Sequence, residues 1–99
     1  MRLEKHIINF IQQKAKEFFP KSSVYLFGSR VDDAKRGGDI DLYLIPSKKF
    51  DDERKRKVRF LVKLDEYIGE QKIDTVIAKD KTRPIEQVAL RDGMILWMS

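Results

Sequence analysis

The sequence predicts a mixed α/β (α+β) domain in which a small mixed β-sheet is flanked by helices. Segments with apolar residues at helical spacing alternate with short apolar runs rich in strand-forming residues, and Gly or Pro separates most of them. The 99 residues contain no internal repeat, linker or low-complexity tract. We therefore expect a single domain over residues 1–99 with a core of modest size.

The first half of the chain predicts one helix and two strands. Residues 3–19 place apolar side chains on one helical face, and Pro20 stops the pattern. Residues 24–27 form a short strand that ends at Gly28. Residues 39–45 form the second strand. The polar segment between the two strands could begin with a short helix at its serine.

The second half predicts two helices separated by a strand. Residues 51–68 combine acidic residues in the first turn with a broad apolar face, and Gly69 is a plausible stop. Residues 73–78 form the third strand. Residues 83–92 form a short helix with proline in its first turn.

Residues 94–98 form a final strand, or an apolar tail, with apolar residues on both faces. A buried central strand explains this pattern, and so does an exposed edge used for contact with a second protein. The sequence leaves both alternatives open.

Composition excludes several classes of site. The chain has no cysteine and one histidine, which excludes disulfides, thiolate metal sites and histidine-rich zinc sites. No apolar run approaches membrane-spanning length and no signal-like segment leads the chain, so we expect a soluble cytoplasmic protein. The net charge of +5 favours acidic partners such as nucleotides, nucleic acids or an acidic protein surface.

Two aspartates in the second strand are the most informative feature. Asp39 and Asp41 are separated by one residue, so their side chains project from the same face of a strand, about 7 Å apart. Such a pair favours a hard divalent cation with oxygen ligands. The Gly28–Ser29 turn upstream is a backbone that can approach a phosphate closely. Together they indicate phosphoryl or nucleotidyl transfer.

Asp74 is the best candidate for a third acid. It lies inside an apolar, β-branched run, where a charge is costly without a function or a partner. If that strand lies beside the one that carries Asp39 and Asp41, the three carboxylates converge.

The run Val24 to Arg30, followed by Gly38 to Ile45, resembles the signature of the DNA polymerase β-like nucleotidyltransferase superfamily. More narrowly, nearly the whole chain resembles the minimal nucleotidyltransferase (MNT) domains, small prokaryotic proteins that are often antitoxins paired with HEPN-domain toxins. The resemblance implies the nucleotidyltransferase fold and transfer of AMP from ATP to a hydroxyl, for some members a tyrosine of the cognate HEPN toxin. Because 99 residues leave little material for a lobe that covers the substrate, we also expect the domain to borrow surface from a partner or another copy, as a homo- or hetero-oligomer.

The same resemblance implies a role for each matching residue. Gly28 and Ser29 would hold the phosphates of the nucleotide, and Arg30 would touch phosphate or stabilise the loop. The acids Asp39, Asp41 and Asp74 would be catalytic and would bind two Mg²⁺ ions, with the third also helping to deprotonate the attacking hydroxyl.

Two alternative functions remain open. A non-catalytic antitoxin would neutralise its partner by stable binding alone. A nucleic-acid-binding module would use the basic stretch between residues 48 and 63, although no stacking aromatic pattern supports it and such a stretch is more often the solvated face of a helix.

Overall fold

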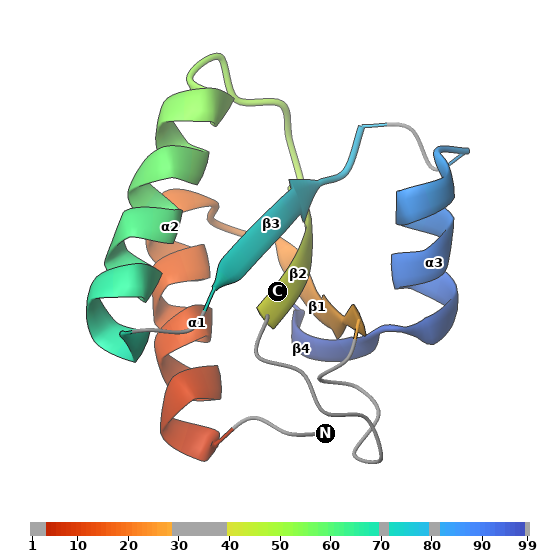
Figure 1. Cartoon of the computed structure of the whole chain (residues 1–99). Helices are drawn as coiled ribbons and strands as arrows, with labels where there is room; N and C mark the ends of the chain where they lie inside the picture. The colour runs from red at the N-terminus through yellow and green to blue at the C-terminus, as the bar shows by residue number, and fades with distance from the viewer. Residues whose placement is uncertain (1–3, 29–39, 70–71, 80–81, 99) are drawn as a thin grey trace.

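The computed structural model describes residues 4–28, 40–69, 72–79 and 82–98 as three helices and four strands (Figure 1). In chain order these are α1 (Lys5–Phe18), β1 (Ser23–Phe27), β2 (Ile40–Ile45), α2 (Glu53–Ile68), β3 (Ile73–Ile77), α3 (Pro84–Asp92) and β4 (Met94–Met98).

The described ends of these elements agree with the sequence-based expectation to within two residues. Pro20 follows α1 and Pro84 occupies the first turn of α3, so both prolines stand where their missing N–H groups cost no helical hydrogen bond. The short helix expected at Ser29 lies outside the described residues. None of the described helices is long and apolar enough to cross a membrane.

The four strands form one mixed sheet in the order β3-β2-β1-β4. β1 is antiparallel to both of its neighbours, whereas β2 and β3 are parallel and are connected through α2. β4 lies at one edge of the sheet. Of the two positions that the sequence left open for residues 94–98, a central strand or an edge strand, the edge is therefore the observed one. β3 lies at the opposite edge, beside β2.

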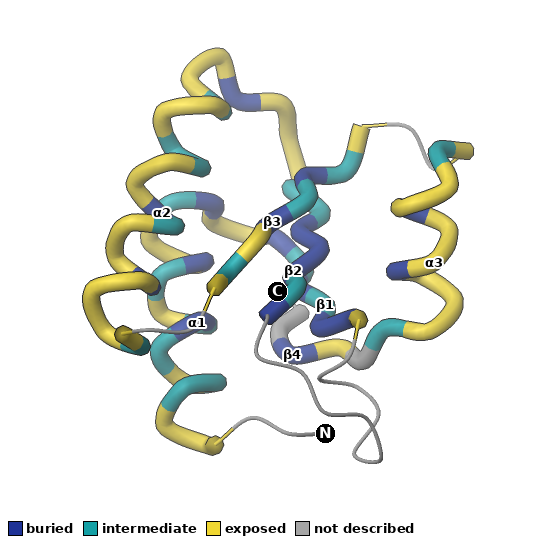
Figure 2. The backbone as a smooth tube through the Cα atoms, viewed as in Figure 1, coloured by how far each residue is buried: buried dark blue, intermediate teal, exposed yellow. Residues whose placement is uncertain are grey.

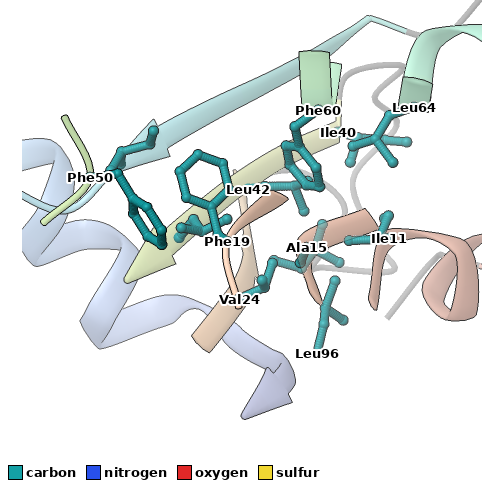
Figure 3. Close-up of a cluster of buried hydrophobic side chains, with 13 residues drawn as sticks. Ile11, Ala15, Phe19, Val24, Ile40, Leu42, Phe50, Phe60, Leu64 and Leu96 are labelled. Carbon is teal, nitrogen blue, oxygen red and sulfur yellow. The ribbon is translucent and has the colours of Figure 1, made fainter. Parts of the chain in front are cut away.

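Helices α1 and α2 cover one face of the sheet and enclose the main hydrophobic core (Figure 1). Alternate residues of β2 point into this core, as the period of a strand requires, while Phe19 and Phe60 meet edge to face at 6.2 Å between ring centroids. Figure 3 shows the cluster, which includes Ile11, Ala15, Phe19, Val24, Ile40, Leu42, Phe50, Phe60, Leu64 and Leu96.

Helix α3 packs on the other face of the sheet (Figure 1). A smaller cluster forms there around Phe27, Tyr43 and Ala89. Figure 2 shows the contrast along α3 between the buried positions toward the sheet and the exposed outer positions. The residues of β2 that do not enter the main core therefore face α3, and Asp41 is one of them.

Candidate functional site

Gly28 closes β1 in a conformation that only glycine adopts without strain. Its φ is +80°, in the left-handed region. A β-carbon added at this position would overlap Oδ2 of Asp41, which belongs to the neighbouring strand. The absence of a side chain at Gly28 therefore leaves the space that the Asp41 carboxylate fills.

Asp41 and Asp74 are direct partners in the parallel pairing of β2 with β3. Paired residues of adjacent strands point to the same face and have backbones about 4.8 Å apart. Asp41 is partly buried and Asp74 is exposed, so the pair lies at the solvent side of the α3 face. Two like charges so placed repel each other, and a cation between them removes the repulsion.

The surroundings of Asp74 leave room for a ligand. Its Oδ1 accepts a hydrogen bond from the backbone N–H of Thr75 at 2.9 Å, which orients the carboxylate at the edge of the sheet. The Thr75 side chain points to the opposite face of β3, in register with Leu42 of the core, and its Oγ1 is buried without a hydrogen-bond partner among the described residues. One oxygen of Asp74 is thus held by the backbone while the carboxylate remains open to solvent.

The structure brings together three of the six residues expected at the site, namely Gly28, Asp41 and Asp74. β3, which carries the third acid Asp74, lies beside β2, which carries Asp41, as convergence of the acids requires. Ser29, Arg30 and Asp39 lie outside the described residues, so their expected roles stay predictions.

The donor chemistry of the site fits Mg²⁺. Two adjacent carboxylates supply the oxygen ligands that a hard cation prefers, and exposure of Asp74 allows the ion to keep water ligands. In the part of the chain that the structure describes, no group of three or more His, Cys, Asp or Glu residues could hold a metal ion. Asp39, the third metal ligand expected from the sequence, lies outside the described residues, so its role stays a prediction.

The sequence did not predict a buried polar network that lies on the same face of the sheet as the acid pair. Glu86 of α3 has no exposed surface, and its Oε1 accepts a hydrogen bond from the hydroxyl of Tyr43 at 2.7 Å. Its Oε2 pairs with Nε of Arg83 at 2.6 Å. The backbone N–H of Lys79 donates to both carboxylate oxygens at 3.2 Å. The carboxylate therefore ties α3 to β2 and to the chain that follows β3.

The network also fixes the protonation of its tyrosine. Burial raises the pKa of Tyr43 well above its usual value, and the hydrogen bond to Glu86 raises it further. Tyr43 thus stays a neutral donor, two residues from Asp41 on the same face of β2. In the sequence, only the three-residue spacing between Arg83 and Glu86 indicated a pairing, and nothing indicated burial.

A basic groove of about 600 Å³ runs along β3 from Asp74 toward the start of α3. We call it the β3 groove. Its charged residues are Glu53, Arg54, Lys57, Asp74, Lys79 and Arg83. A second pocket of about 730 Å³ lies between Ile45 and Ala78, beyond the far ends of β2 and β3. Although larger, this second pocket does not include the acid pair, so we assign the candidate site to Asp41, Asp74 and the adjoining β3 groove.

Comparison with known proteins identifies a family. The model of the family described as polymerase beta, nucleotidyltransferase matches residues 5–99. No curated protein sequence matches the chain.

Several solved structures share the fold. A mutant form of the MntA–HpeT toxin–antitoxin complex has a TM-score of 0.74 at 20% identity, with 93% of this chain and 73% of that chain covered. A tri-AMPylated Shewanella oneidensis HEPN toxin in complex with an MNT antitoxin has a TM-score of 0.73 at 21% identity, covering 98% and 74%. A toxin–antitoxin structure with AMP-PNP has a TM-score of 0.72 at 22% identity, covering 93% and 73%. At these identities the likeness concerns the fold.

Proposed function

This chain belongs to the polymerase beta nucleotidyltransferase family, and from that premise we propose that it transfers AMP from ATP to a hydroxyl of a HEPN-type toxin and thereby acts as an antitoxin. The observation that carries the proposal is the register that pairs Asp41 with Asp74 on one face of the sheet, beside Gly28. The similar structures described as MNT antitoxins with HEPN toxins, one of them tri-AMPylated, support the choice of acceptor.

Each residue of the site has a task in this reaction. Asp41 and Asp74, with Asp39, would hold Mg²⁺, which when bound neutralises the triphosphate. Gly28 lets the triphosphate approach the backbone at the end of β1, where Ser29 and Arg30 would contact phosphate. Asp74, exposed at the edge of the sheet, would accept the proton of the attacking hydroxyl. A bond then forms between that oxygen and the α-phosphorus, the bond to the β-phosphate breaks, and pyrophosphate leaves.

Transfer of radioactive label tests the proposal. The purified protein is incubated with α-labelled ATP, Mg²⁺ and a HEPN-type toxin from the same organism. We expect label on the partner, and at least a roughly 100-fold lower rate for Asp41→Asn and for Asp74→Asn, because each change removes a charged ligand. Asp65→Asn, which changes an exposed acid on α2 by the same chemistry, should leave the rate unchanged.

Two results would contradict the enzymatic proposal. One is label transfer that persists in both acid variants. The other is neutralisation of the partner by wild-type protein without any label transfer, which would leave a stable complex as the mechanism. A protein that forms such a complex has no use for two adjacent carboxylates.

A further inference from the structure

The outer edge of β3 has backbone groups that no strand in the described part of the chain uses. The amide of Ile40 donates to the carbonyl of Lys72, and the amide of Ala78 donates to the carbonyl of Leu44. In a parallel pair, alternate residues of a strand direct both backbone groups to the same neighbour. The backbone groups of Ile73, Thr75 and Ile77 therefore point away from β2. The amide of Thr75 donates to Oδ1 of Asp74, and the carbonyl of Ile77 accepts a hydrogen bond from Nη2 of Arg83 at 3.5 Å. The carbonyl of Thr75 and the amide of Ile77 are the groups that remain to face the β3 groove.

The far part of the β3 groove is positively charged. Arg54 and Lys57 reach it from α2, while Lys79 and Arg83 lie beyond the end of β3. In the described part of the chain, Arg83 is the one cation of this groove that pairs with a carboxylate, that of Glu86. Within the described residues, the side chains of the other three cations form no ion pair.

The acids of the β3 groove are fewer than its cations, and they lie apart. Asp74 stands at one end, and Glu53 stands among the cations at the other end. Lys79 follows Asp74 by five residues, which is about 16 Å along extended chain. A negatively charged, extended ligand matches this arrangement.

The lining of the β3 groove favours a peptide over a nucleic acid. No aromatic residue is among the described residues that line it, so bases would find no stacking surface there. Its apolar members, such as Val76 and Ile85, suit the side chains of an added strand. The carbonyl of Thr75 and the amide of Ile77 at this strand edge offer hydrogen bonds that one residue of a peptide backbone can satisfy.

We propose that the β3 groove binds an acidic, extended segment of the acceptor protein as an additional strand along β3. In this arrangement, acidic side chains three to five residues from the acceptor hydroxyl meet Arg54, Lys57 and Lys79, while the hydroxyl lies at Asp74. This inference rests on the proposed function for its acceptor, but the binding that it describes needs neither ATP nor catalysis.

Fluorescence anisotropy tests this binding in the absence of ATP and Mg²⁺. The probe is a fluorescein-labelled peptide with a central tyrosine and glutamates three to five positions away on both sides. A Gly/Ser peptide of equal length and a single-stranded RNA of equal charge are the comparisons. We expect only the acidic peptide to bind.

Charge reversal on α2 provides matched variants. Arg54→Glu combined with Lys57→Glu should weaken peptide binding at least about tenfold, since it reverses two charges in the groove. Arg59→Glu combined with Lys63→Glu makes the same change on the same helix outside the groove and should have less than about a threefold effect. Circular dichroism verifies that both variants are folded.

Backbone methylation tests strand addition. Two peptides carry methyl groups on alternate backbone nitrogens, one at the odd positions and the other at the even positions. Only one of them should lose binding, because an added strand directs every second amide toward β3. Equal binding of the two methylated peptides, equal weakening by both charge-reversed variants, or tighter binding of the RNA would each overturn the proposal. Because binding is measured without ATP and Mg²⁺, a wild-type protein that binds the acidic peptide but transfers no label would count against the proposed function alone.

Discussion

Gly28 and Asp41 show how one atom can determine the geometry of the site. A β-carbon at residue 28 and the carboxylate of Asp41 would occupy the same volume. The carboxylate fills this volume because residue 28 is glycine and has no β-carbon. Gly69, at the end of α2, offers a natural comparison. Its φ is +88°, close to that of Gly28, but an added β-carbon would have no heavy atom within 4 Å.

Replacing each of these glycines by alanine separates the effect of backbone strain from the effect of displacing the Asp41 carboxylate. Gly28→Ala and Gly69→Ala should each lower the free energy of unfolding by about 1 kcal/mol, because alanine is strained at positive φ. Only Gly28→Ala should reduce AMP transfer, since only there does the methyl group displace Asp41. Urea unfolding and the label-transfer assay measure the two effects. Wild-type transfer by Gly28→Ala would contradict this account.

The attachment of α3 depends on one buried carboxylate. In the described structure α3 is the helix on its face of the sheet, and the apolar cluster beneath it is small. Glu86 supplements that cluster with hydrogen bonds to β2 and to the chain after β3. Because Tyr43 and Asp41 lie on the same face of β2, the network also supports the strand that carries the acid pair.

Neutral substitution of Glu86 tests this attachment. Glu86→Gln should lower the free energy of unfolding by about 2 kcal/mol, since it leaves Arg83 without its partner charge and one of the donors unsatisfied. Tyr43→Phe should cost about 1 kcal/mol, because it removes a single donor. Glu66→Gln, an exposed change on α2, should fall within about 0.5 kcal/mol of the wild type. A Glu86→Gln protein as stable as Glu66→Gln in urea would show that the network contributes nothing.

The elements themselves could be predicted from sequence because their signals are local. The apolar faces of α1 and α2, and the glycines and prolines between segments, fix the described boundaries to within two residues. The acid pair could be predicted only in part. The D-x-D spacing sets the face of Asp41, but the neighbour of β3 depends on how the sheet assembles.

Glu86 could not be predicted from sequence for a related reason. A glutamate in the first turn of a helix is normally exposed and stabilised by the helix dipole. Its burial here depends on Tyr43, which is 43 residues away in the chain. Periodicity does not encode contacts at such a separation.

For the molecule as a whole, the acid pair should make folding sensitive to Mg²⁺. Without the ion, Asp41 and Asp74 repel each other across adjacent strands at the cost of about 0.2–1 kcal/mol. Relieving the repulsion in a domain of 99 residues is measurable, because total stability is typically about 5–15 kcal/mol. An ion that binds only the folded protein adds stability in proportion to the logarithm of its concentration.

Thermal unfolding with and without Mg²⁺ measures both contributions. In EDTA, Asp74→Asn should be as stable as the wild type or more stable, since asparagine keeps the acceptor for the Thr75 amide and removes one charge. Mg²⁺ at about ten times its Kd should stabilise the wild type by about 1.4 kcal/mol and the variant by less. NaCl at matched ionic strength controls for screening. An equal gain for both proteins would rule out the pair as the magnesium site.

The parallel register of β2 and β3 limits which changes of chain length the fold can accept. The connections before and after β3 can gain or lose a residue at small entropic cost. A residue inserted within β3 ahead of Asp74 would instead send its carboxylate toward the core, where Leu42 and Phe60 are packed. Length variation among related sequences should therefore spare this strand and collect in the loops around it.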